Sequence, residues 1–184
     1  MVGFPLETDR LLIRPYEEAD LDPLSAVLCD PETLLHFPRV YTRQEVAAAI
    51  RMGIRQHREL GYALWAVVVK DPGEMIGSCG FAHRSVEGED LVELGWHLNR
   101  RYWNRGLATE AARACRDHAF SSLGFERFVS LVVPENLPSR RVAQKLGMWV
   151  EREIVYRGLR HLVYRLEAAE AEGGAPRYPV PRGR

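Results

Sequence analysis

The sequence predicts a mixed α/β fold in which a mostly antiparallel sheet contains one central parallel pair of strands. Two apolar runs, Tyr62–Val69 and Met75–His83, are joined by the turn Lys70–Glu74, whose Asp-Pro-Gly core is typical of a hairpin. A third run, Leu91–Asn99, follows without an intervening helix and extends the hairpin into an antiparallel meander. A long Ala-rich helical pattern then leads to the apolar run Arg127–Val133. A strand–helix–strand unit of this length places its two strands parallel, with a right-handed crossover.

The elements before the meander follow from periodicity and from their end signals. Leu11–Arg14 is a short strand that a proline ends, and Ala19–Cys29 is a short helix preceded by acidic residues. Thr42 and Glu45 have the spacing of a capping box, and the amphipathic helix that they begin stops at Gly61.

The elements after the meander complete the sheet. The Ala-rich helix spans about 105–122, and a second, short helix begins after Asn136, which has the residue type of an N-cap. Trp149–Tyr156 and Leu159–Leu166 form a closing hairpin. The expected element order is therefore β-α-α-β-β-β-α-β-α-β-β.

The length of 184 residues suits one domain, which we expect to span residues 1–167. Residues 168–184 are Glu/Ala-rich and then Gly/Pro/Arg-rich, with few groups to bury. They are expected to be a flexible tail, and docking on a partner is the alternative.

Composition excludes several classes of partner. The net charge is zero, so no electrostatic argument favours a nucleic acid or an anionic membrane. The N-terminus lacks an apolar signal core and the longest apolar run is too short to span a bilayer, so we expect a cytoplasmic protein. The odd number of cysteines (Cys29, Cys79 and Cys115) indicates reduced core thiols, and a catalytic thiol is the alternative. His36 and His57 lack a second ligand at helical spacing, so no metal site is expected.

The stretch from Leu91 to Thr109 has the pattern of an anion-binding site. It passes from a strand through a basic, aromatic turn to the small residues of Asn104–Thr109, where the Ala-rich helix opens. Unpaired amides and the helix dipole at such an end attract phosphate, and small residues allow it to approach closely. An ordinary strand–helix connection is the alternative, and these residues alone leave both open.

Several segments, taken in order, resemble the GNAT superfamily of N-acetyltransferases, and within it the branch that acetylates the N-terminal amines of ribosomal proteins. The resemblance covers nearly all of residues 7–167. It is carried by E-T-D-R-L-L-I-R-P, V-E-L-G-W-H-L, Y-W-N-R-G-L-A-T-E-A, P-E-N-L-P-S-R-R-V-A-Q-K-L-G-M and Y-R-G-L-R-H-L-V-Y-R-L. It implies that the central parallel pair is splayed into a V-shaped cleft and that the chain binds acetyl-CoA as cosubstrate, without a metal.

The resemblance also assigns cofactor-binding residues. The family's phosphate loop corresponds to 103–108, with Trp103 where the family has Gln or Arg. The amide of Leu98 is the implied donor to the thioester oxygen, whereas Asn136 is explained equally well as an N-cap. The expected cofactor-binding residues are Trp96, Leu98, Trp103, Asn104, Arg105, Gly106, Leu107, Ala108, Thr109 and Asn136.

The catalytic residues implied by the resemblance are fewer. Glu93 is the candidate base, acting through a water, although a strand glutamate can equally be a solvent-facing residue. Many family members use a tyrosine as general acid at the position of Ala143, so this chain departs from them. Ser139 matches the serine of the look-alike branch, and Tyr156 is the reserve acid.

The leading hypothesis is therefore direct transfer of acetyl from acetyl-CoA to a primary amine, most simply a protein N-terminus, in a ternary complex. A small amine such as an antibiotic or a polyamine is the first alternative acceptor. A non-catalytic acyl-CoA sensor is the alternative from another functional class. Either a monomer or a homodimer fits the sequence.

Overall fold

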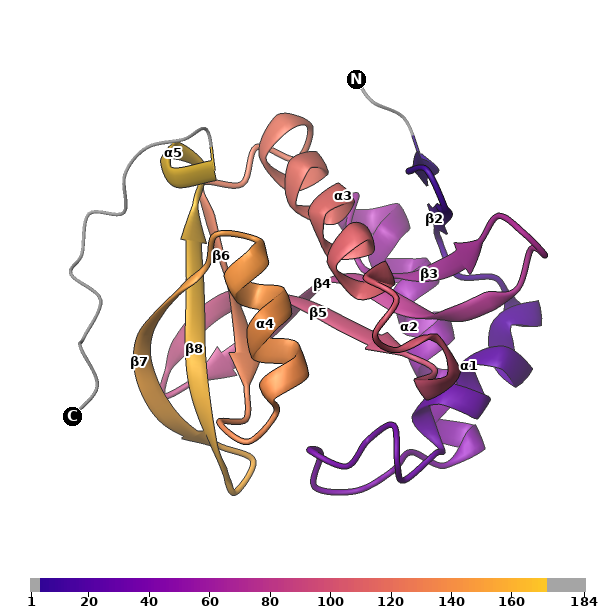
Figure 1. The fold of residues 1–184 in the computed structure, drawn as a ribbon, viewed down its shortest axis with the longest axis horizontal. Helices are drawn as coiled ribbons and strands as arrows, with labels where there is room; N and C mark the ends of the chain where they lie inside the picture. Colours follow the sequence, from indigo (N-terminus) through magenta and orange to yellow (C-terminus); the bar gives the residue numbers. More distant parts are fainter. Residues whose placement is uncertain (1–3, 172–184) are drawn as a thin grey trace.

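The computed structural model describes residues 4–171, in which eight strands form one sheet (Figure 1). The strand order is β1-β2-β3-β4-β5-β6-β8-β7, and every neighbouring pair is antiparallel except β5 and β6. The predicted mixed sheet with one central parallel pair is confirmed. The strands are β1 (Leu6–Glu7), β2 (Leu11–Arg14), β3 (Leu64–Val69), β4 (Met75–Val86), β5 (Glu89–Leu98), β6 (Arg127–Val132), β7 (Trp149–Tyr156) and β8 (Leu159–Glu167).

Helices cover both faces of the sheet. One face of the N-terminal strands packs against α1 and α2, and the opposite face carries α3 and α4 (Figure 1). Two 3-10 turns, η1 (Glu18–Asp20) and η2 (Arg100–Tyr102), connect strands to helices. The helices are α1 (Leu21–Leu28), α2 (Arg43–Leu60), α3 (Leu107–Ser121), α4 (Leu137–Lys145) and α5 (Ala168–Ala171).

Among the differences from the sequence expectation are a later start of α3 and an additional first strand. The Ala-rich helix α3 begins at Leu107 rather than near Arg105, because Gly106 has a φ of 77° and cannot continue a right-handed helix. The strand β1 was not expected, since two residues carry no periodicity; Leu6 pairs with Ile13 in β2.

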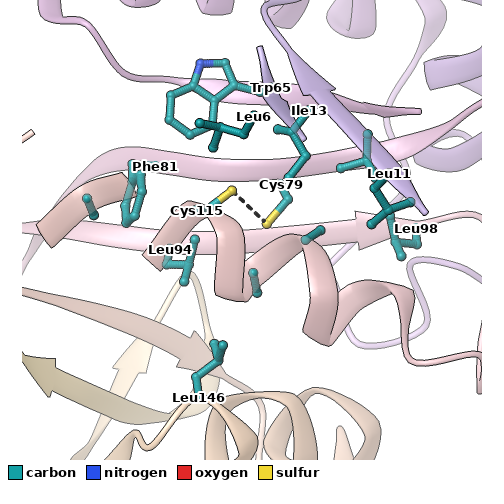
Figure 2. Close-up of a cluster of buried hydrophobic side chains, with 14 of the residues drawn as sticks. Leu6, Leu11, Ile13, Trp65, Cys79, Phe81, Leu94, Leu98, Cys115 and Leu146 are labelled. Atoms are coloured by element: carbon teal, nitrogen blue, oxygen red, sulfur yellow. Dashed lines mark hydrogen bonds between the residues drawn. The ribbon is translucent and has the colours of Figure 1, made fainter. Parts of the chain in front are cut away.

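The main core lies between the sheet and α3. Trp65, Cys79, Phe81 and Cys115 are fully buried there (Figure 2). The Sγ atoms of Cys79 and Cys115 are 3.6 Å apart, and both thiols are free. Burial raises the pKa of the Cys115 thiol well above its ordinary value. Two of the three cysteines are therefore core thiols as expected, and Cys29 is only partly buried.

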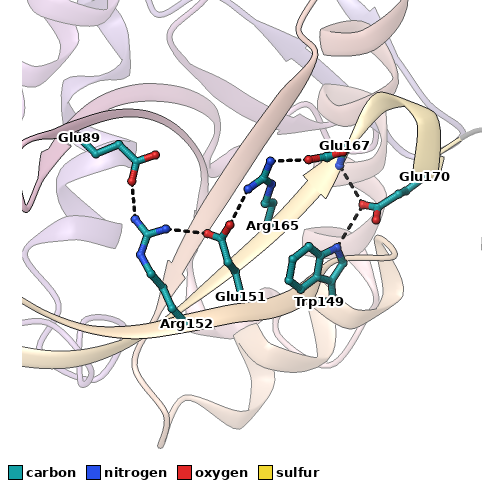
Figure 3. Close-up of polar contacts among 7 residues, drawn as sticks. All are labelled: Glu89, Trp149, Glu151, Arg152, Arg165, Glu167 and Glu170. Carbon is teal, nitrogen blue, oxygen red and sulfur yellow. Dashed lines mark hydrogen bonds and ion pairs between the residues drawn. The ribbon is translucent and has the colours of Figure 1, made fainter. Parts of the chain in front are cut away.

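A chain of ion pairs joins the start of β5 to the C-terminal strands (Figure 3). Arg152 of β7 lies 2.6 Å from Glu89 and 2.8 Å from Glu151, while Arg165 of β8 lies 2.5 Å from Glu151 and also pairs with Glu167. Networks of this kind hold strands together better than isolated surface pairs do. It ties the two halves of the sheet together where β5 begins.

The short helix α5 lies against the closing hairpin. Glu170 accepts a hydrogen bond from the Trp149 indole and another from the Glu167 amide, each at 3.2 Å (Figure 3). The expected tail 168–184 thus begins with a helical turn, and residues 172–184 lie outside the described part of the chain. Over residues 4–171 no helix is long and apolar enough to cross a membrane.

Two histidines from opposite faces of the sheet meet at its N-terminal edge. His57 of α2 and His118 of α3 both pack against the ring of Phe4, at centroid distances of 4.8 and 5.1 Å, and the Trp65 indole donates to His57 Nδ1 at 3.2 Å. Burial lowers the pKa of both side chains below the ordinary value of 6.5.

We therefore expect the free energy of unfolding to fall with pH below about 6.5, because the unfolded chain takes up protons that the folded chain does not. For each histidine, the loss of stability stops once the pH passes its folded pKa. Urea unfolding at about pH 7.5, 6.5 and 5.5 measures the effect, since most carboxylates remain ionised there. Equal stability at all three values would contradict this account.

Candidate active site

The parallel strands β5 and β6 part after one register pair, Glu93 with Val129. Figure 1 shows the arrows of β5 and β6 pointing in different directions. At the point of parting, the buried Ser130 hydroxyl donates to the Leu94 carbonyl at 2.7 Å, in the place of a further ladder hydrogen bond. The expected splayed pair is therefore present, with Ser130 at its closed end.

The parting leaves a stretch of the β5 backbone without a partner strand. The Asn99 amide donates to the Ile76 carbonyl at 2.8 Å, which continues the β4–β5 ladder. Because backbone groups of successive residues point to opposite edges of a strand, odd-numbered residues of β5 bond to β4 and even-numbered ones face β6. The amides of Trp96 and Leu98 consequently face the parting, where β6 has no residue in register with them.

The N-terminus of α3 presents unpaired amides close to the end of this strand. Asn104 and Gly106 have positive φ values of 60° and 77°, which turn the chain sharply into the helix. Among the described residues, nothing accepts a hydrogen bond from the amides of Leu107, Ala108 or Thr109. Such an end carries partial positive charge and suits a phosphate.

An ion pair from the first hairpin braces this loop. Arg10 lies 2.5 Å from Glu110 in the first turn of α3, and it also donates to the Arg105 carbonyl at 3.0 Å. Thr8 donates to the same glutamate at 2.6 Å. The loop geometry is therefore fixed by side chains from the turn between β1 and β2, in the segment E-T-D-R of the sequence.

Trp103 connects the strand to the loop. Its indole nitrogen donates to the Leu98 carbonyl at 2.7 Å, although the side chain remains 43% exposed. Arg105 lies over the ring of Tyr102, with its guanidinium carbon 5.3 Å from the centroid. The Arg105 side chain thus packs on a neighbouring ring, while its backbone belongs to the loop.

Glu93 lies on the face of β5 opposite α3. Its side chain is only 14% exposed, and Oε2 accepts a hydrogen bond from Arg84 at 2.6 Å. Sequence reasoning missed Arg84, because the pairing depends on the register of β4 against β5. Oε1 of Glu93 has no partner among the described residues and is the oxygen left for a water.

His97 shares the face of Glu93, since residues an even number apart point the same way along a strand. Its ring lies 5.2 Å from that of Phe37, and Ser78 Oγ is 3.5 Å from its Nδ1. Burial, and secondarily the charge of Arg84, lowers its pKa to about 4. A neutral imidazole beneath the loop between α1 and α2 was not anticipated from the sequence.

The other sequence-predicted residues have structural roles or separate positions. Asn136 caps α4 by accepting a hydrogen bond from the Ser139 amide at 3.1 Å, as the N-cap explanation requires. Ser139 lies in the first turn of α4 and is partly buried. Tyr156 packs edge-on against His161 at 5.9 Å, and no contact joins it to Glu93 within residues 4–171. Ala143 is fully buried in the core.

A surface hollow of about 820 Å³ adjoins the free end of α3. It is lined by both basic and acidic side chains, among them Arg10, Arg113, Lys145, Glu110 and Asp117. Across residues 4–171, the hollow included, no group of three or more His, Cys, Asp or Glu side chains could hold a metal ion.

Comparison with known families identifies this arrangement. The profile of the acetyltransferase (GNAT) domain matches residues 10–149, which include β5, the loop and α3. The chain belongs to the GNAT family. GNAT enzymes take the acetyl group from acetyl-CoA, so this protein is an N-acetyltransferase by family.

Individual GNAT relatives agree with the family assignment. The uncharacterised protein YkkB of Bacillus subtilis is 33% identical over 150 residues, which are 81% of this chain and 87% of that protein. The crystal structure of an acetyltransferase from Agrobacterium tumefaciens superposes with a TM-score of 0.76 at 29% identity, and covers 91% of this chain and 96% of that one. A ribosomal L7/L12 alpha-N-protein acetyltransferase (RimL), solved with coenzyme A, has the same fold, with a TM-score of 0.73 at 19% identity over 89% and 97% of the two chains.

In this GNAT domain the residues present fit acetyl-CoA. The amides at the start of α3 suit the pyrophosphate, and the free edge of Trp96 and Leu98 suits an extended arm that carries amide groups. Ser130 and Arg84 contact β5 and His97 lies on it, and none of the three was predicted from the sequence. A lone serine within the apolar run F-V-S-L-V was the sequence signal for the first of them.

Proposed function

We propose that this GNAT enzyme acetylates the free α-amino group of a polypeptide N-terminus. The observation that carries the cosubstrate part is the unpaired edge of Trp96 and Leu98, which leads directly to the free amides at the start of α3. Acetyl-CoA supplies an activated thioester to be attacked by an amine. The chain is proposed to supply the groups that accept and donate protons and that stabilise developing charge.

Three tasks fall to residues of the site. Because an α-amino group has a pKa near 8, a fraction of it is already neutral at physiological pH, and only a modest base is required. Glu93, through its free Oε1 and a water, is proposed to accept the proton that the amine releases. The Leu98 amide is proposed to donate to the thioester oxygen as negative charge develops there. Ser139 is the proposed proton donor to the departing thiolate, with Tyr156 in reserve.

The pairing of two carboxylates on β5 favours a singly charged acceptor over a polyamine. Glu89 and Glu93 are each paired with an arginine, at 2.6 Å in both cases. Paired carboxylates offer little attraction to a polycation, whereas a peptide N-terminus brings one charge and apolar side chains. Phe37 and Leu35, which are 39% and 73% exposed on the loop beside His97, offer apolar surface to such an acceptor.

A panel of acceptors tests the proposal. Release of the free CoA thiol would be measured with four acceptors. They are a short peptide with a free N-terminus, a lysine-containing peptide with a blocked N-terminus, spermidine and an aminoglycoside. We expect kcat/KM to be at least about tenfold higher for the free N-terminus than for any other acceptor, a discrimination of about 1.4 kcal/mol. Faster turnover of spermidine or the aminoglycoside would replace the peptide by a small amine. Binding of acetyl-CoA without turnover of any amine would instead favour a sensor.

A further inference from the structure

Both ends of the free β5 edge are closed by side-chain donors. At the inner end the Ser130 hydroxyl donates to the Leu94 carbonyl, and at the outer end the Trp103 indole donates to the Leu98 carbonyl, each at 2.7 Å. All backbone groups of these even-numbered residues face the parting. Three groups remain between the two donors, namely the N–H and C=O of Trp96 and the N–H of Leu98.

The Trp103 bond differs from the Ser130 bond in its surroundings. Ser130 is 2% exposed, so its hydroxyl satisfies a carbonyl that has no access to water. Trp103 is 43% exposed, whereas Leu98, whose carbonyl accepts its hydrogen bond, is 5% exposed. The bond from Trp103 satisfies the Leu98 carbonyl, orients the Leu98 peptide and occupies one acceptor of the free edge.

We infer that Trp103 is a positioning residue that holds the Leu98 peptide for the arm of acetyl-CoA. This inference rests on the proposed use of acetyl-CoA. Because the Leu98 carbonyl is occupied, a ligand on this edge must accept a hydrogen bond from the Trp96 N–H, donate one to the Trp96 carbonyl and accept one from the Leu98 N–H. A ligand arm with an amide group followed by a second carbonyl provides these groups in this order. Trp96 and Leu98 are separated by about 6.6 Å along the strand, which sets the spacing of the two ligand carbonyls. Trp103 thus acts on the arm, while the amides of α3 act on the phosphates.

Two ligands separate these roles. Acetyl-CoA has both arm and phosphates, whereas 3′-phosphoadenosine 5′-diphosphate has the phosphates without the arm. Trp103→Phe removes the indole N–H and keeps an aromatic ring. We expect calorimetry to give about tenfold weaker binding of acetyl-CoA to Trp103→Phe, the equivalent of one hydrogen bond, and unchanged binding of the armless nucleotide.

Trp149→Phe is the matched control, since it removes an indole hydrogen bond to Glu170 far from the loop. It should bind both ligands like the wild type. Equal losses for both ligands in Trp103→Phe would assign the residue to the phosphate loop and overturn the inference. Unchanged acetyl-CoA binding would overturn it as well. Wild-type protein that binds neither ligand would refute the proposed function itself, which is a distinguishable result.

Discussion

Gly106→Glu is expected to abolish acetyl-CoA binding, with at least about a hundredfold loss of affinity in calorimetry. The residue immediately precedes the free amides of Leu107, Ala108 and Thr109. A carboxylate at this position repels a pyrophosphate at close range and competes for the same donors, which are worth several kcal/mol together in a charged hydrogen-bonded site.

Gly124→Glu is the control at the opposite end of the same helix. Gly124 also has a positive φ, 67°, and a Cβ there would meet no atom within 4 Å. At Gly106, with φ at 77°, a Cβ would meet only Arg10 Nη2, at an ordinary 3.6 Å. Both variants therefore carry a similar backbone strain, roughly 1 kcal/mol, and a similar loss of thermal stability is expected. Retained acetyl-CoA binding by Gly106→Glu would show that the phosphates bind elsewhere.

Glu93→Gln is expected to lower kcat about a hundredfold while the Kd for acetyl-CoA stays unchanged, since general base catalysis contributes at least this much. The amide is nearly isosteric and keeps an acceptor for Arg84, but it cannot take up a proton. Turnover of the preferred amine and calorimetric binding of acetyl-CoA measure the two quantities separately.

Glu89→Gln controls for the loss of an ion pair. Glu89 lies on the same strand and pairs with Arg152 at 2.6 Å, as Glu93 does with Arg84. Its replacement should leave kcat within about twofold of the wild type, because it touches none of the proposed reacting groups. If both variants lost turnover equally, the ion pairs and not the base would explain the effect, and if neither did, Glu93 would have no part in the reaction.

Elements with a strong local signal could be predicted from the sequence. The hairpin of β3 and β4 has two apolar runs on either side of Asp-Pro-Gly. The capping box of Thr42 and Glu45 is present, with the Thr42 amide donating to Glu45 at 2.8 Å. The free amides at the start of α3 also follow from local residues. Each of these features depends on side chains only a few positions apart.

The contacts that complete the site depend on register and could not be predicted. Arg84 meets Glu93 because Ala82, and not a neighbour, stands opposite Glu93 in the β4–β5 ladder. A shift by one residue would turn every side chain to the other face. The Ser130 bond to Leu94 likewise exists only because β5 and β6 part after a single pair. The sequence left open whether Glu93 faces solvent, and the structure shows it largely buried.

Chemical labelling of Cys79 and Cys115 reports whether α3, the helix that follows the cofactor loop, stays docked on the sheet. Both thiols are fully buried, Cys79 in the sheet and Cys115 in α3, so a thiol reagent reaches them only when α3 lifts from the sheet or the domain unfolds. Cys29, which is partly exposed, reacts independently of that motion. A ligand bound at the N-terminus of α3 stabilises the docked helix by mass action, so it slows the labelling of Cys79 and Cys115. The rate of this labelling therefore measures how much of the loop is occupied by ligand, without an acceptor amine.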